Sequence, residues 1–147
     1  MVRLRPVKFV FIRFAIACLL ALTSRGALAQ EQEDKPETIA MNWCNSLLSG
    51  DTAKTMECSG VPFLWDGRTL LKTAAELRSR VDAVVAGKGV REVRATAASR
   101  VKRGEHDERT AQQLAVDAWT VHVKIQDETI TVYVSPKPPF TVIGFRD

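Results

Sequence analysis

The clearest pattern in the chain is an alternation of apolar and polar residues between Val121 and Val134, which reads VHVKIQDETITVYV. Side chains of an extended strand point alternately to opposite faces, so this alternation predicts an antiparallel hairpin with Asp127-Glu128 at its turn. In that register Val121 lies opposite Val134, and His122 lies opposite Tyr133. One face would then be β-branched, apolar and buried, with Val121, Val123, Ile125, Ile130, Val132 and Val134 on it.

Three helices are predicted before this hairpin. The first spans Pro36 to Gly50, since proline suits a first turn and apolar residues recur every four positions. The second is short and runs from Asp51, its predicted N-cap, to about Cys58. The third starts at a capping box, Thr73 to Glu76, and stops at Gly87 and Gly89.

The remaining elements are predicted strands. Asp66-Gly67 is a strong hairpin signal between short strands at Val61–Trp65 and Arg68–Leu71, because a tight type I′ turn needs positive φ at both central residues. Alternating or apolar segments predict further strands at 92–101, 115–126, 129–134 and 141–146, with a charged, turn-rich connection at 102–113.

The positive charge of the chain is confined to its start. The whole sequence has 21 Lys and Arg against 17 Asp and Glu, a formal net charge of +4. Five of those bases, and none of the acids, lie in residues 1–29, so the remaining 16 bases face 17 acids and the net charge becomes −1. A nucleic-acid role, which a basic chain would suggest, therefore has no support.

Residues 1–29 have the parts of a secretory signal peptide: a basic start, the apolar run Phe14–Leu22 and a small-x-small site at Ala27-Leu28-Ala29. The run is far shorter than the roughly 20 residues that span a bilayer, so no stable membrane span is expected after cleavage. An uncleaved anchor is the alternative. We expect an exported, periplasmic or secreted protein with a flexible start at 30–35 and one domain at 36–147.

Cys44 and Cys58 are the two cysteines of the expected mature chain. Because disulfides persist in oxidising compartments, we predict that these two residues form a disulfide between the first two helices. A loop of that size would stabilise the fold by about 3 kcal/mol in the chain-entropy model. A metal site or a reactive thiol is the alternative, but no histidine lies nearby and no cluster has metal-ligand spacing. No metal or cofactor is expected.

The order helix, short helix, short hairpin, helix and long antiparallel strands resembles the nuclear transport factor 2-like superfamily, which includes ketosteroid isomerases and polyketide cyclases. The resemblance rests on residues 42–81, NWCNSLLSGDTAKTMECSGVPFLWDGRTLLKTAAELRSRV, and on the terminal FTVIGFRD. It implies an α+β fold in which a curved antiparallel sheet wraps about three N-terminal helices, a cystatin-like cone roll. In this family the concave side often holds a pocket, and the convex side often forms an oligomer interface.

Applied to this chain, the resemblance points to a pocket and to two candidate catalytic bases. Isomerases of this fold use a carboxylate base with an oxyanion hole made by a tyrosine and a protonated acid. The candidate bases are Asp117, on the face of the apolar strand residues, and Asp66, at the hairpin turn. Each also has a simpler role, as a solvated strand end or a turn residue. The predicted pocket lining is Trp43, Trp65, Trp119, Val121, Val132 and Phe145, unless helix side chains fill that space.

The predicted outer face of the sheet carries His122, Tyr133 and Lys124, which form a candidate interface for a homodimer. No motif in the sequence identifies a reaction, and whether the protein is an enzyme stays open. We expect a non-catalytic domain that binds a small apolar ligand or a protein partner in the cell envelope. The alternatives are a small isomerase-type or cyclase-type enzyme with a carboxylate base, and an assembly protein that acts through the convex face.

Overall fold

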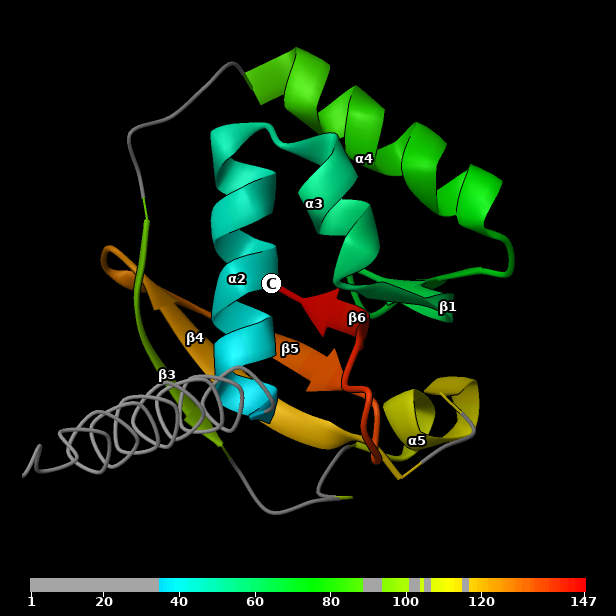
Figure 1. Ribbon diagram of the computed structural model, residues 1–147. Coiled ribbons are helices and arrows are strands. Elements are labelled where there is room, and N and C mark those ends of the chain that lie inside the picture. Colours follow the sequence, from blue (N-terminus) through cyan, green and yellow to red (C-terminus); the bar gives the residue numbers. More distant parts are fainter. Residues whose placement is uncertain (1–34, 89–93, 101–103, 105–106, 115–116) are drawn as a thin grey trace, which may run out of the picture. The chain divides into compact units, whose positions relative to one another are not determined.

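The computed structural model of the protein describes residues 35–88, 94–100, 104, 107–114 and 117–147 (Figure 1). The predicted signal peptide at residues 1–29 and residues 30–34 of the predicted flexible start lie outside these ranges. The export signal and its cleavage site therefore stay predictions.

The described part of the chain alternates between helices and strands. Two consecutive helices open it, a β-hairpin and a long helix follow, and strands make up most of the remainder (Figure 1). In chain order the elements are α2 (Pro36–Ser49), α3 (Thr52–Glu57), β1 (Ser59–Trp65), β2 (Thr69–Leu71), α4 (Ala74–Lys88), β3 (Ala95–Arg100), α5 (Glu108–Leu114), β4 (Trp119–Ile125), β5 (Glu128–Val134) and β6 (Val142–Arg146).

All six strands join one mixed sheet in the order β2-β1-β6-β5-β4-β3. Neighbouring strands are antiparallel except for β1 and β6, which run parallel. The α+β class is thus confirmed, whereas the expected purely antiparallel sheet is wrong at that pair. Parallel strands need a long connection between them. β1 and β6 have one, because most of the domain lies between these two strands in the chain.

Local sequence signals explain where the first two helices begin and end. Pro36 occupies the first turn of α2, and Gly50 ends it in the left-handed conformation with a φ of 80°. The Asp51 carboxylate then accepts a hydrogen bond of 2.9 Å from the backbone N–H of Lys54 and caps α3. The predicted helix boundaries in this region are confirmed to within a residue or two.

The third helix has the predicted capping box. The backbone N–H of Glu76 donates to the Thr73 hydroxyl at 3.2 Å, and the Glu76 carboxylate accepts from the backbone N–H groups of Lys72 at 2.7 Å and Thr73 at 3.1 Å. These hydrogen bonds satisfy donors at the helix start that have no partner within the helix. They also lower the pKa of the Glu76 carboxyl, with the hydrogen bond from Lys72 as the largest cause.

The β4–β5 hairpin has the predicted faces but not the predicted register. Its turn is Gln126-Asp127, one residue earlier than expected, so Val121 lies opposite Val132. The predicted pairing was therefore wrong by two residues. Such a shift leaves each side chain on its predicted face, because side-chain direction along a strand repeats every two residues.

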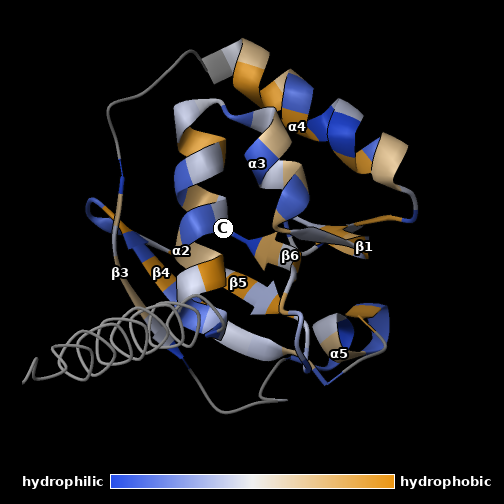
Figure 2. Cartoon of the chain, in the orientation of Figure 1, coloured by the Kyte–Doolittle hydropathy of each residue, from blue (hydrophilic) through white to orange (hydrophobic). Residues whose placement is uncertain are grey.

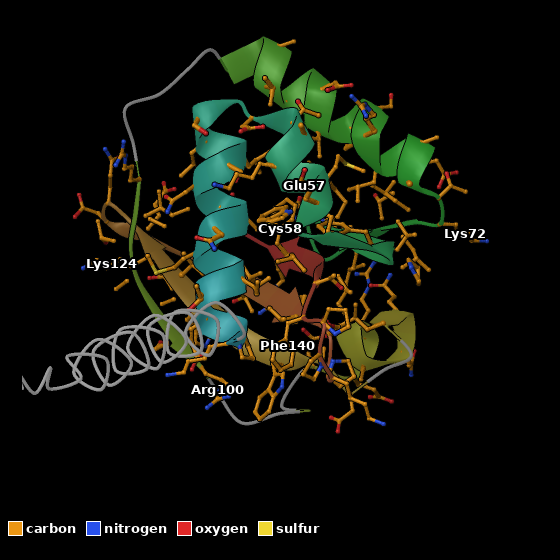
Figure 3. All side chains as sticks on the ribbon, viewed as in Figure 1. Glu57, Cys58, Lys72, Arg100, Lys124 and Phe140 are labelled. Atoms are coloured by element: carbon orange, nitrogen blue, oxygen red, sulfur yellow. The ribbon has the colours of Figure 1, made fainter. Side chains whose placement is uncertain are left out.

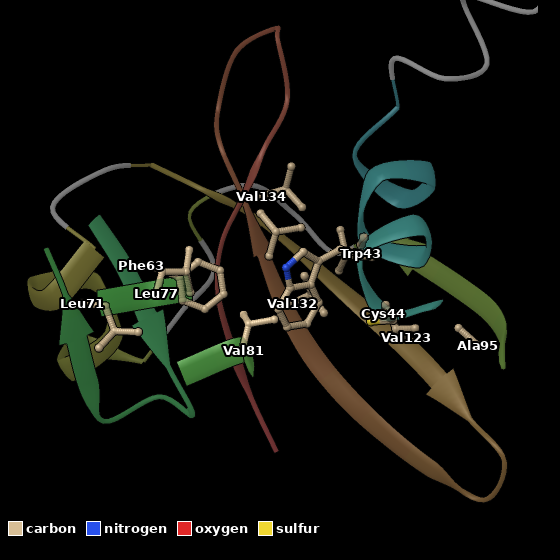
Figure 4. Packing of buried hydrophobic residues seen from close by; sticks show 13 residues of the cluster. Trp43, Cys44, Phe63, Leu71, Leu77, Val81, Ala95, Val123, Val132 and Val134 are labelled. Atoms are coloured by element: carbon tan, nitrogen blue, oxygen red, sulfur yellow. The ribbon is translucent and has the colours of Figure 1, made fainter. Parts of the chain in front are cut away.

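The main hydrophobic core lies between the sheet and the three helices α2, α3 and α4. Trp43 of α2 and Phe63 of β1 are each at most 1% exposed and meet near its centre (Figure 4). Figure 2 shows apolar and polar residues following one another in bands along α2 and α4, as expected of helices buried on one side. The buried residues of this cluster are Ala40, Trp43, Cys44, Phe63, Leu71, Leu77, Val81, Ala95, Val121, Val123, Val132, Val134 and Val142.

A second, smaller core lies on the opposite face of the sheet and includes a helix that the sequence did not predict. Helix α5 falls in the segment expected to be a charged connection, and Asp107 caps it by accepting a 2.8 Å hydrogen bond from the backbone N–H of Thr110. Leu114 of α5 packs in this cluster with Leu64, Ala118, Tyr133 and Ile143. The outer face of the sheet is therefore partly covered.

Candidate functional site

A cavity of about 340 Å³ opens beside the main core. Helices α2 and α4, the turns of both hairpins and the end of β6 contribute to its wall. Its apolar residues form the floor, and its polar residues are turn or strand-end positions. The lining residues are Trp43, Cys44, Leu47, Leu48, Trp65, Asp66, Val84, Ile125, Gln126, Glu128, Ile130, Phe145 and Asp147.

Aromatic rings form one wall of the cavity. The centroids of the Trp65 and Phe145 rings are 5.0 Å apart with an interplanar angle of 82°, an edge-to-face arrangement. The ring centroids of Trp43 and Phe145 are 5.5 Å apart. The indole N–H of Trp43 donates a hydrogen bond of 2.9 Å to the Ser59 hydroxyl. These contacts hold the rings in fixed orientations, so the wall is preformed.

The cavity has an acidic rim. Asp66 is half-buried, while Glu128 and Asp147 are exposed. Asp66 and Gln126 both have left-handed φ angles, 51° and 57°, because each lies in a tight turn between two strands. Among the described residues that line this cavity, none is a lysine, arginine or histidine.

The structure brings together three of the six residues that we predicted to line a pocket. Trp43, Trp65 and Phe145 line the cavity. Val121 and Val132 are fully buried and belong to the packed core instead. Trp119 lies elsewhere, with the Arg100 guanidinium 4.6 Å from the centre of its ring. The half of the predicted pocket near the start of β4 is therefore filled, in keeping with the close packing of protein interiors.

The two candidate bases differ in position. Asp117 is exposed and does not line the cavity, so it cannot act as a base within it. Asp66 does line the cavity, at its rim. Sequence reasoning missed Glu128 as a rim residue because the predicted turn placed it elsewhere, and it missed Leu47 and Leu48, whose only signal is their position on the apolar side of α2.

The expected disulfide is absent. Cys44 and Cys58 are free thiols that are not close enough to bond, although both helices form as predicted. Cys44 is buried in the main core, and burial raises the pKa of its thiol to about 12. Cys58 is half-buried at the end of α3 (Figure 3), and burial also raises the pKa of its thiol. The pairing was predicted from compartment and spacing alone, and neither sets the direction of the two side chains.

The outer-face residues do not form the predicted exposed pair. His122 lies opposite Thr131, 3.4 Å from its hydroxyl, rather than opposite Tyr133. Tyr133 is only 2% exposed, because α5 and its neighbours cover it. Lys124 is exposed (Figure 3). Tyr133 thus belongs to the second core and offers no exposed aromatic surface to a partner.

Neither a metal site nor a membrane span is evident in the described ranges. No group of three or more metal-ligating side chains occurs among those residues. No helix among them is long and apolar enough to cross a bilayer. Comparison of the chain with protein families, characterised proteins and solved structures gave no significant match.

Proposed function

We propose that this chain is an exported domain of the nuclear transport factor 2-like type, which binds a small apolar ligand in the cavity and catalyses no reaction on it. The observation that carries the proposal is the composition of the cavity: apolar and aromatic side chains make its floor, and its carboxylates lie at the rim. An apolar pocket with few polar groups is typical of small-ligand sites. The order of the helices and strands supports the family assignment.

The position of the acids favours binding over catalysis. A general base of this fold type works in a desolvated site, where burial tunes its pKa. Here Glu128 and Asp147 are exposed, and Asp66 sits in a turn at the rim. The enzyme alternative would need a fully buried carboxylate in the cavity, and none of the described lining acids is fully buried.

A ligand is favoured over a protein partner because little apolar surface is exposed. In the described ranges, Val61 is the single large apolar side chain that is exposed, at 44%. Stable protein interfaces need a much larger buried area with an apolar centre. The cavity, by contrast, is a partly open concave site with a mainly apolar lining.

Titration with 1-adamantanol, a compact uncharged apolar probe, tests the proposal. Trp43 and Trp65 line the cavity and report on binding by fluorescence, and Trp119→Phe removes the tryptophan outside it. We expect a saturable signal in the Trp119→Phe protein. Ile130→Trp fills part of the cavity and should abolish binding, whereas Val61→Trp, at an exposed site, should not. Binding weaker than about 1 mM, or binding unaffected by Ile130→Trp, would refute the proposal.

The export part of the proposal has its own test. Expression with the natural start in a secreting bacterial host should yield a protein that begins at Gln30 after cleavage behind Ala29. Intact-mass measurement of the exported fraction checks this. Recovery of only the uncleaved, membrane-associated chain would favour the anchor alternative.

A further inference from the structure

The acidic rim of the cavity is not balanced by bases in its lining. Asp66 comes from the β1–β2 turn, Glu128 from the start of β5 and Asp147 from the residue after β6. Three segments that are far apart in sequence thus place carboxylates around one apolar cavity. A concave site lined by one sign of charge focuses its field and attracts ligands of the opposite sign.

Three arginines line another, smaller hollow of about 170 Å³. Asp66 and Asp147 border both hollows, and the arginines of the smaller one are Arg68, Arg109 and Arg146. The Arg146 guanidinium already contacts the Asp107 carboxylate at 2.6 Å. Glu128 borders the larger cavity and not the smaller one, so of the three acids it is the one that the arginine-lined hollow does not share.

The aromatic wall provides a second attraction for a cation. Trp65 and Phe145 meet edge to face and are each only half-buried, so they present ring surface in fixed orientations, while Trp43 packs beside them in the core. A cation within about 6 Å of a ring centre is attracted by the electron-rich face, most strongly by tryptophan. Tertiary and quaternary ammonium groups suit such a site, because their apolar substituents lose little hydration on entry.

We propose that the ligand of this cavity is an apolar amine, whose hydrocarbon body lies on the floor and whose cationic nitrogen lies between the aromatic wall and the rim carboxylates. This inference rests on the proposed function and names the chemical class of its ligand. A carboxylate or sulfate on the same body is disfavoured by the rim. An uncharged ligand gains from the floor alone.

Three probes with one hydrocarbon body test the inference: 1-adamantyltrimethylammonium, 1-adamantanol and 1-adamantanecarboxylate. Titration of the Trp119→Phe protein should show that the ammonium binds about tenfold more tightly than the alcohol, the sum of modest contributions from exposed charges and the aromatic faces. The carboxylate should bind most weakly. Added salt should reduce the preference for the ammonium without changing the affinity for the alcohol.

Neutral variants of the rim identify the source of the preference. In the double variant Asp66→Asn and Glu128→Gln, affinity for the ammonium should fall at least about threefold toward that of the alcohol, and affinity for the alcohol should stay the same. Asparagine tolerates the left-handed φ at position 66, so the turn is kept. Glu57→Gln, an exposed acid on α3 away from the cavity, is the matched control and should change nothing.

The outcomes separate this inference from the proposed function. Equal binding of ammonium and alcohol, or a preference that survives the double variant, overturns the amine assignment and leaves apolar binding intact. If none of the three probes binds, both proposals fail.

Discussion

Replacing Tyr133 with alanine should destabilise the fold strongly, because this residue belongs to a core and not to a free surface. Tyr133 is 2% exposed in the cluster with Leu64, Leu114 and Ile143. Removing a buried aromatic side chain costs about 3–5 kcal/mol through lost transfer free energy and the cavity left behind. A domain of this size has a total stability of about 5–15 kcal/mol, so the variant would lose a large part of it.

Urea unfolding followed by circular dichroism measures this loss. With a slope of about 2 kcal/mol per molar urea, a cost of 4 kcal/mol lowers the midpoint by about 2 M. His122→Ala is the control, since His122 lies on the same sheet face but is only half-buried, and it should shift the midpoint far less. If Tyr133→Ala changed the midpoint no more than the control, the second core would not exist as described. If Tyr133→Ala changed only the oligomeric state, Tyr133 would belong to an interface and not to a second core.

Three further predictions concern the thiols and the helix caps. Under native conditions at pH 8, a thiol reagent should modify Cys58 before Cys44, because Cys44 is buried and its pKa of about 12 keeps the thiol protonated. Cys44 should react only after urea is added. Mass spectrometry of the modified peptides checks the order, and equal rates of modification would contradict it. The Glu76 carboxyl has a lowered pKa, mainly through the hydrogen bond from the backbone of Lys72, so its stabilising effect is present at neutral pH and is lost as pH falls through the lowered folded value. We expect the difference in unfolding free energy between the native protein and Glu76→Gln to shrink as the pH is lowered from 7 to about 3. A difference that stays constant with pH would count against the capping role. Asp107→Ala should cost about 1 kcal/mol in urea unfolding through loss of the α5 cap, whereas Glu108→Ala in the same turn should cost less.

Local signals in the sequence predicted most of the helices and turns. Proline and glycine mark the ends of α2, and Thr73 with Glu76 marks the start of α4. In each case the signal is local, because it depends on residues next to the helix end and not on distant contacts. The Asp66-Gly67 turn was also predicted, and both residues have the left-handed φ that such a turn needs. The buried face of β4 and β5 was predicted from the apolar residues that recur at every second position, a pattern that is unchanged by a shift of two residues in the pairing.

The incorrect predictions depended on contacts between distant residues. The β4–β5 register was set by a turn with Gln126 at a positive φ, a residue type that gives little turn signal. Helix α5 is polar along much of its length, and its burial depends on Leu114 meeting strand residues such as Leu64 that are distant in sequence. Whether the cysteines can bond depends on where Cys44, on α2, and Cys58, just after α3, lie in space, and their spacing in the sequence does not determine this.

The same limit applies to the candidate site. Its aromatic wall was predicted in part, because large rings on predicted core faces must meet in a small domain. Of its rim, Asp66 was a candidate from the sequence, but Glu128 and Asp147 were not, because they acquire their position from hairpin geometry and from the placement of β6. The acids of the rim lie on turns and strand ends, where polar residues are common and carry no distinctive sequence signal.

The placement of β6 between β1 and β5 has a consequence for the order of assembly. Until residues 142–146 are available, the strands can form only two separate ribbons, β2-β1 and β5-β4-β3, with no strand to pair with both. A polypeptide emerging from the ribosome therefore cannot complete this sheet until residues 142–146 have emerged. In the export that we propose, this late completion would leave the sheet open while the chain is still being made.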